Sequence, residues 1–120
     1  METWEVKGTA TPDQTRTFEH GKVGVCSLGS HTIGRVEFEP GWSWSGSVKP
    51  IVGTDRCQTA HIGYVIEGQL GIRMADGSEF QLKAGDAYRI DPGHDAWVEG
   101  NDRYAAVEFE SLKDYAKAPA

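Results

Sequence analysis

The stretch HIGYVIEGQLGIRMADGSEFQLKAGDAYRIDPGHDAWV, residues 61–98, consists of short segments of alternating apolar and polar residues, separated by turns that contain glycine. Such alternation indicates β-strands, because successive side chains of a strand point to opposite faces, whereas a helix repeats its apolar residues at three and four. Asp76-Gly77 tolerates the positive φ angles of a two-residue hairpin turn. The stretch therefore predicts antiparallel strands over residues 61–67, 69–75, 79–82, 87–90 and 94–98.

The same pattern continues on both sides of this stretch. We expect two earlier strands over residues 22–28 and 32–39, and a last strand over residues 103–110 that packs through Val107 and Phe109. Many short strands in a chain of 120 residues favour a β-sandwich or a β-barrel, and the pattern does not choose between them.

The two ends of the chain differ from its middle. Residues 1–17 are polar, and we interpret them as an N-terminal arm that lies across the β domain or against a second subunit. Residues 111–117, SLKDYAK, predict a short helix with Ser111 as its N-cap. The expected organisation is thus an arm (1–17), one β domain (18–110) and a C-terminal helix or tail (111–120).

Composition restricts the class of protein. A chain of 13.1 kDa with 38% hydrophobic and 25% charged residues is typical of one ordered domain. The net charge of −6 argues against nucleic acid or an anionic membrane as partner, because phosphate binding needs a basic surface. There is no apolar run of about 18–20 residues and no signal-peptide pattern, so we expect a cytoplasmic protein in which Cys26 and Cys57 stay reduced.

Two segments resemble the paired motifs of the cupin superfamily. Residues 53–68, GTDRCQTAHIGYVIEG, are similar to the first motif, and residues 85–101, GDAYRIDPGHDAWVEGN, to the second. The resemblance covers about residues 20–110 and includes a group of small, largely uncharacterised bacterial cupins. It implies a double-stranded β-helix, or jelly-roll barrel, that holds a metal or a ligand in its mouth. It also implies a homodimer, since many cupins dimerise through a sheet.

The metal positions of the motifs are occupied by other residue types than usual. In the alignment with the cupin motifs, His61 takes the usual glutamate position, while Cys57 and Asp55 take the two histidine positions. His94 lies two residues before Ala96, where the last histidine usually falls, and both side chains project to the same side of a strand. The resemblance thus implies a site of Cys57, His61 and His94, with Asp55 as a fourth ligand.

Thiolate and imidazole ligands suit zinc and also iron, and three protein ligands would leave one coordination position open. We therefore expect a metal-dependent site that acts on a small organic molecule, as an oxygenase, lyase or isomerase. The alternative is a binding or sensing cupin without a metal, because an isolated cysteine or histidine is more often a structural residue. A third possibility is a structural subunit, and whether the protein is an enzyme stays open.

Several residues are candidates for a ligand pocket. Trp42 and Trp44 would project from the same side of an extended strand and form an aromatic wall, with Trp97 near the second motif. Lys49 would hold a carboxylate at the barrel mouth, and Tyr64 would orient an imidazole. Packing in the core or at a dimer contact is the alternative for the tryptophans, and solvent exposure is the alternative for the lysine.

Overall fold

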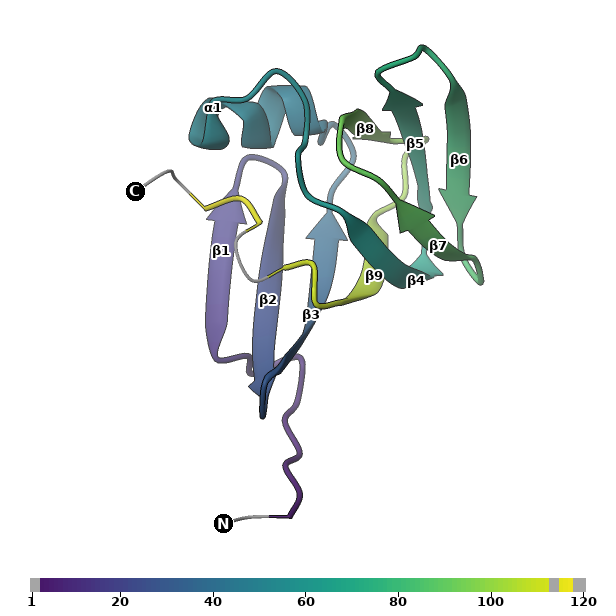
Figure 1. Ribbon diagram of the computed structural model, residues 1–120. Helices are drawn as coiled ribbons and strands as arrows, with labels where there is room; N and C mark the ends of the chain where they lie inside the picture. Colours follow the sequence, from purple (N-terminus) through teal and green to yellow (C-terminus); the bar gives the residue numbers. More distant parts are fainter. Residues whose placement is uncertain (1–2, 113–114, 118–120) are drawn as a thin grey trace.

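Two antiparallel sheets enclose one apolar core in residues 3–112 and 115–117, which the computed structural model describes (Figure 1). The six-stranded sheet has the order β1-β2-β3-β9-β4-β7, and the three-stranded sheet has the order β6-β5-β8. The strands are β1 (Gln14–Phe18), β2 (Gly21–Leu28), β3 (His31–Phe38), β4 (His61–Glu67), β5 (Gln69–Met74), β6 (Glu79–Lys83), β7 (Ala87–Ile90), β8 (His94–Val98) and β9 (Tyr104–Phe109). This arrangement confirms the predicted all-β barrel.

The core lies between the inner faces of the two sheets. Val23, Val36, Ala106 and Val65 are register partners along one row of the large sheet, and each is at most 2% exposed. The small sheet contributes buried leucine and isoleucine side chains opposite them. Burying each large aliphatic side chain contributes about 1.5–3 kcal/mol, so these side chains are a main favourable contribution to the packing of the two sheets.

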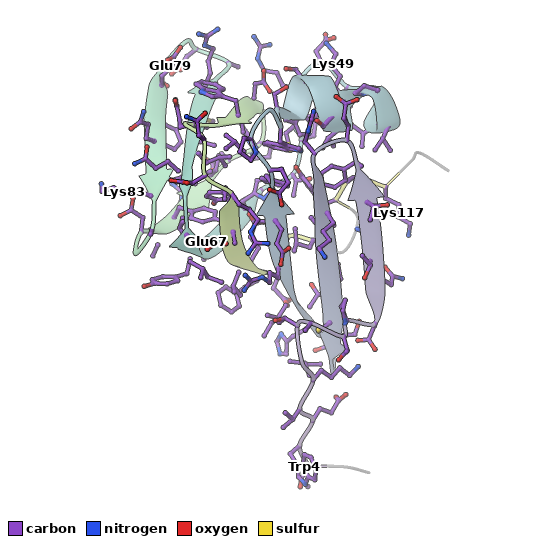
Figure 2. All side chains as sticks on the ribbon, turned by 180° about the vertical axis from the view of Figure 1, so that it is seen from behind. Trp4, Lys49, Glu67, Glu79, Lys83 and Lys117 are labelled. Atoms are coloured by element: carbon purple, nitrogen blue, oxygen red, sulfur yellow. The ribbon has the colours of Figure 1, made fainter. Side chains whose placement is uncertain are left out.

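The sheet begins earlier than the sequence predicts. The strand β1 lies mostly within residues 1–17, which we had assigned to the arm, and it pairs with β2 at the edge of the sheet. Its residues are polar because an edge strand is open to solvent, so alternation does not mark it. Residues 3–13 before β1 form no strand, and the Thr11 N–H donates to the Gly8 carbonyl in a turn. Pro12 packs on Gly24, while Trp4 lies at the far end of this segment, away from the barrel (Figure 2).

Helical structure occurs at a different place than predicted. A π-helical turn, Trp44–Val48, continues into helix α1 (Lys49–Val52), and Gly53 ends it with a φ of 82°. No helix is present in the described residues 111–112 and 115–117, where Ala116 has a φ of 54° that a right-handed helix does not allow. Residues 113–114 and 118–120 of the predicted helix or tail lie outside the described residues. No described helix has the length and apolar character needed to cross a membrane.

An apolar row lies on the outer face of β4. Ile62 is 52% exposed, Tyr64 49% and Ile66 40%, and Phe109 on the neighbouring β9 is 41% exposed. Exposed apolar faces of this kind often mark contacts between proteins. The homodimer expected from the resemblance remains a prediction.

Candidate metal centre

Cys57, His61 and His94 lie together at one end of the barrel. Cys57 is in the loop before β4, His61 is the first residue of β4, and His94 is the first residue of β8. One ligand atom from each residue lies within 4.8 Å of the others, and the three residues are 2%, 8% and 3% exposed. The fold thus brings together three of the four ligands predicted for a metal.

Backbone pairing fixes the position of Cys57, although its loop is not a strand. The Cys57 N–H donates to the His94 carbonyl at 2.8 Å, and the Gly93 N–H donates to the Cys57 carbonyl at 2.7 Å. The thiol and the His94 imidazole are therefore held beside each other by peptide hydrogen bonds, and their approach does not depend on side-chain rotamers alone.

A buried carboxylate orients His61. Its Nδ1 is 2.6 Å from Glu108 Oε1, while its Nε2 is 3.6 Å from Cys57 Sγ. Glu108 also accepts hydrogen bonds from the Tyr88 hydroxyl at 2.7 Å and from the Ser111 hydroxyl at 2.6 Å. A carboxylate is an acceptor only, so it holds the proton of His61 on Nδ1 and leaves Nε2 directed toward the thiol.

The charges of this cluster depend on one another. Burial raises the pKa of Glu108, but the charge of His61 and the three hydrogen bonds outweigh it and hold the pKa below its usual range. Burial likewise disfavours the His61 imidazolium, yet the carboxylate and the thiol raise the pKa of His61 to about 10. At Cys57, burial alone would raise the pKa, but the neighbouring His61 and His94 imidazoles outweigh burial and lower the pKa to about 6. At neutral pH the metal-free cluster is a thiolate, an imidazolium and a carboxylate.

Two glycines make room for this buried polar cluster. Tyr88, Gly63, Glu108 and Gly34 follow one another in register across β7, β4, β9 and β3. A Cβ at Gly63 would lie 2.7 Å from the Tyr88 hydroxyl oxygen, and a Cβ at Gly34 would lie 2.5 Å from Leu112 Cδ1. Tyr88 reaches Glu108 because no side chain stands between them.

We expect Gly63→Ala to lower the free energy of unfolding by about 2–4 kcal/mol, since the new methyl group overpacks the site and displaces the tyrosine from the carboxylate. Urea denaturation measures the change. Gly8→Ala is the matched control, because a Cβ there meets only Thr11 Oγ1, at 3.5 Å. Equal stability of the two variants would contradict the assignment of Gly63.

A second acceptor orients His94. Its Nδ1 is 2.9 Å from the carbonyl oxygen of Asp91, which can only accept, so Nδ1 carries the proton and Nε2 is left with a lone pair. Both histidines of the cluster therefore hold Nδ1–H toward an oxygen. This is the usual arrangement around histidines that bind a metal through Nε2.

The distances and the donor types fit a small transition-metal ion. With Zn–S of about 2.3 Å and Zn–N of about 2.0–2.1 Å, a tetrahedral zinc ion separates sulfur from nitrogen by about 3.6 Å. Cys57 Sγ and His61 Nε2 are separated by 3.6 Å. This pair therefore already has the separation that a zinc ion requires, and the three ligand atoms together lie within 4.8 Å of one another.

Asp55 and Lys49 do not belong to this site. The Asp55 side chain is 96% exposed and lies 3.8 Å from the Lys49 ammonium, so it is not the fourth ligand. Lys49 begins helix α1 at the rim of the barrel and does not line the interior (Figure 2). The cupin alignment gave Asp55 a ligand position, and this prediction is wrong because the loop after helix α1 exposes its side chain. For Lys49 the alternative of solvent exposure holds, since its side chain is 43% exposed.

The aromatic residues predicted for the pocket fall into two groups. Trp42 and Trp44 are each 2% exposed and line the cavity inside the barrel, although Trp44 lies in a helical turn and not in a strand. Trp97 packs on Gly71 on the outer side of β8 and donates to Glu99 at 2.8 Å. The outward-facing Tyr64, on β4, also lies outside the pocket.

The sequence reading missed Glu108, which is 6% exposed and central to the cluster. We had expected Val107 and Phe109 to face the core, but Tyr104, Ala106 and Glu108 do so. A one-residue error of phase exchanges the two faces of a strand. The available signal was a single carboxylate within the otherwise apolar segment 105–109.

Comparison with known proteins supports the fold. No family model matches the sequence, and no curated protein matches it. Among solved structures, the oxalate decarboxylase of Lactobacillus farciminis, in a formate complex, is similar with a TM-score of 0.59 at 18% identity. The match covers 82% of this chain but only 30% of the decarboxylase, so this chain spans less than a third of that protein.

Two further structures are similar. A Klebsiella pneumoniae protein with a double-stranded β-helix domain has a TM-score of 0.57 at 19% identity, covering 85% of this chain and 87% of its own. The Bacillus subtilis oxalate decarboxylase, which has Mn(II) centres, has a TM-score of 0.50 at 20% identity, covering 78% of this chain and 26% of its own. At these identities the likeness concerns architecture, and the chain has the double-stranded β-helix fold of the cupins.

Proposed function

We propose that the chain is a metalloprotein of cupin fold in which Cys57, His61 and His94 hold one divalent transition metal, zinc or iron. The observation that carries this proposal is the shared orientation of the two imidazoles, each with Nδ1–H bound to an oxygen and Nε2 turned toward the cluster. A metal centre in a similar fold, that of the Bacillus subtilis oxalate decarboxylase, supports it further.

The donor set favours zinc or iron over manganese. Thiolate and imidazole are softer ligands than the carboxylates and waters that suit manganese or magnesium. A bound ion with three protein ligands would keep one position for a water or a substrate oxygen, which it would polarise. On this basis we propose that the site acts on a small organic molecule, in an oxygenase, lyase or isomerase type of reaction.

The surrounding residues prepare the site for this role. Glu108 makes His61 a stronger ligand by accepting a hydrogen bond from its Nδ1–H, and the Asp91 carbonyl fixes the ring of His94. Burial of all three ligands keeps bulk water from the cluster. Because Cys57 must stay a free thiol, we propose a reducing compartment, the cytoplasm, for this protein.

Metal analysis tests the proposal. After equilibration with Zn²⁺ and removal of free ion, we expect the protein to retain about one ion per chain, and Cys57→Ala or His94→Ala to retain less than about a tenth of that. Cys26→Ala is the matched control, because Cys26 is the other buried free cysteine and lies near Gly8, outside the cluster. Zinc retention that is unchanged in the two site variants would exclude this site.

A second function, ligand binding without turnover, is favoured by one observation. The cavity inside the barrel is mostly apolar, and the described chain leaves two buried donors on its wall without a partner. Such a cavity could hold a small molecule without a metal. A ligand that binds equally well after metal removal and is recovered unchanged would support this function.

A further inference from the structure

The cavity extends from the candidate metal centre into the barrel. It measures about 30 Å³, and His61, His94 and Glu108 form part of its wall. Phe38 and Leu70 belong to the apolar remainder of the wall. This space holds about two or three water molecules, which corresponds to a group of about four non-hydrogen atoms.

Two hydrogen-bond donors on this wall have no acceptor. Trp42 Nε1 and the Tyr104 hydroxyl are buried and have no hydrogen-bond partner in the described chain. The two side chains are 2% and 0% exposed, so bulk water does not reach them. An indole N–H is a donor only, and buried donors are nearly always paired. An acceptor inside the cavity would complete the hydrogen bonding of these two donors.

The indole is held rigidly in this place. The Trp42 ring stacks on Phe38 with a centroid distance of 3.7 Å and an interplanar angle of 1°, and Phe38 also contacts the Tyr104 ring at 5.8 Å. The neighbouring Tyr88 hydroxyl donates to Glu108. The rings of Trp42 and Tyr104 thus both stack on Phe38 and belong to one aromatic cluster.

The wall of the cavity offers little to balance the charge of an anion. Glu108, a buried acidic side chain, forms part of this wall. No lysine or arginine of the described chain lines the cavity. A carboxylate or phosphate would enter as an uncompensated buried charge, whereas a neutral oxygen would not.

We propose that the cavity binds an uncharged carbonyl compound, or the carbonyl end of a larger uncharged molecule, whose oxygen accepts hydrogen bonds from Trp42 Nε1 and the Tyr104 hydroxyl. The inference deepens the proposed function, on which it rests for the reaction, by naming the class of substrate. The two hydrogen bonds themselves need no metal. The same wall disfavours acidic substrates, because it contains no lysine or arginine of the described chain.

Acetone and acetate are the probes that test this inference, because they have the same shape and number of non-hydrogen atoms and differ in charge. The indole N–H signals in ¹H–¹⁵N spectra report binding, with the Trp42 signal assigned by its loss in Trp42→Phe. We expect acetone to shift the Trp42 signal downfield with saturation in the millimolar range, as for a ligand of this size, and acetate to leave it unchanged. The Trp97 signal is the internal control, since its N–H already donates to Glu99.

Variants locate the binding. Tyr104→Phe keeps the ring and removes the donor, so acetone should bind about three- to tenfold more weakly. Tyr64→Phe removes an exposed hydroxyl from the outer face of β4 and should change nothing. Retained heat stability of Tyr104→Phe is the check on folding, because the lost hydroxyl has no partner in the described chain.

Two results would overturn the inference. The first is acetate that binds as tightly as acetone. The second is a Trp42 signal that neither probe shifts, which would mean that the cavity holds only water. Each titration is run on zinc-loaded and on metal-free protein with the metal content measured. Absence of zinc binding with an intact acetone response refutes only the metal centre. Zinc binding without an acetone response refutes only the carbonyl site.

Discussion

Glu108→Gln is expected to lower the free energy of unfolding by about 3–5 kcal/mol, the effect of removing one partner from a buried ion pair. The substitution keeps the shape of the side chain and removes its charge. His61, 2.6 Å away and 8% exposed, would then have either to stay charged in the core beside a neutral amide or to give up its proton. Urea denaturation of the metal-free protein at neutral pH measures the loss.

The matched control is Glu79→Gln. Glu79 forms an ion pair with Arg73 on the surface, where the two side chains are 47% and 59% exposed. Exposed pairs of this kind contribute about 0–1 kcal/mol, so this variant should unfold nearly as the parent does. If the free energy of unfolding fell by the same small amount in both variants, Glu108 would not be the counter-ion of His61.

Zinc affinity is expected to rise about tenfold for each pH unit between pH 7 and 9, or about 100-fold in all. In the metal-free protein the carboxylate and the thiol raise the pKa of His61 to about 10, against burial, so its Nε2 carries a proton throughout this range. Zinc must displace that proton, and displacement becomes easier as the pH rises. Cys57, with its pKa lowered to about 6, is already a thiolate and adds no further slope. Competition against a chelator of known pH dependence measures the affinity.

The Glu108→Gln variant is also the control for this slope. Without the carboxylate, the pKa of His61 falls, so a smaller fraction of the protein carries the Nε2 proton that zinc must displace. The zinc affinity of this variant should therefore depend less on pH. A parent protein whose zinc affinity is the same at pH 7 and pH 9 would show that His61 carries no proton on Nε2. The protonation of the cluster would then have to be reassigned.

The strands could be predicted from the sequence because the outer faces of the sheets are exposed to solvent, whereas their inner faces pack in an apolar core. Every predicted strand is present, and the observed bounds differ by no more than one residue at either end, as for residues 69–75 against Gln69–Met74. The hairpin at Asp76-Gly77 forms as expected, with Gly77 at a φ of 89°. Alternation fails for β1, where both faces are largely open to solvent, and it gave the wrong inner face for β9.

The segment between β3 and β4 was predicted poorly because two kinds of signal compete in it. Trp42 and Trp44 have the spacing of a strand, and both are buried as expected, but Ser43 accepts a hydrogen bond from the Gly46 N–H and starts a helical turn. Pro50 near the beginning of helix α1 and Gly53 at its end are ordinary helix boundaries. Reading those boundaries first would have placed Lys49 and Asp55 outside the barrel.

Only part of the candidate metal centre could be predicted from the sequence. The cupin resemblance identified Cys57, His61 and His94, because motif spacing fixes which residues meet at the barrel mouth. Glu108 comes from β9, 47 residues after His61, and it carries no motif. Its partners became visible only through the register of β9 with β4, which a single sequence does not specify.

The three proposed ligands are divided between the two sheets. His61 starts β4 of the large sheet, whereas His94 starts β8 of the small one and is tied by backbone hydrogen bonds to Cys57. An ion held by all three would brace one sheet against the other at this end of the barrel, much as a disulfide cross-link would. Binding of the ion should therefore slow amide hydrogen exchange in β4 and β8 together. After release of the ion, the end of the barrel that contains the three ligands should open before the other strands unfold.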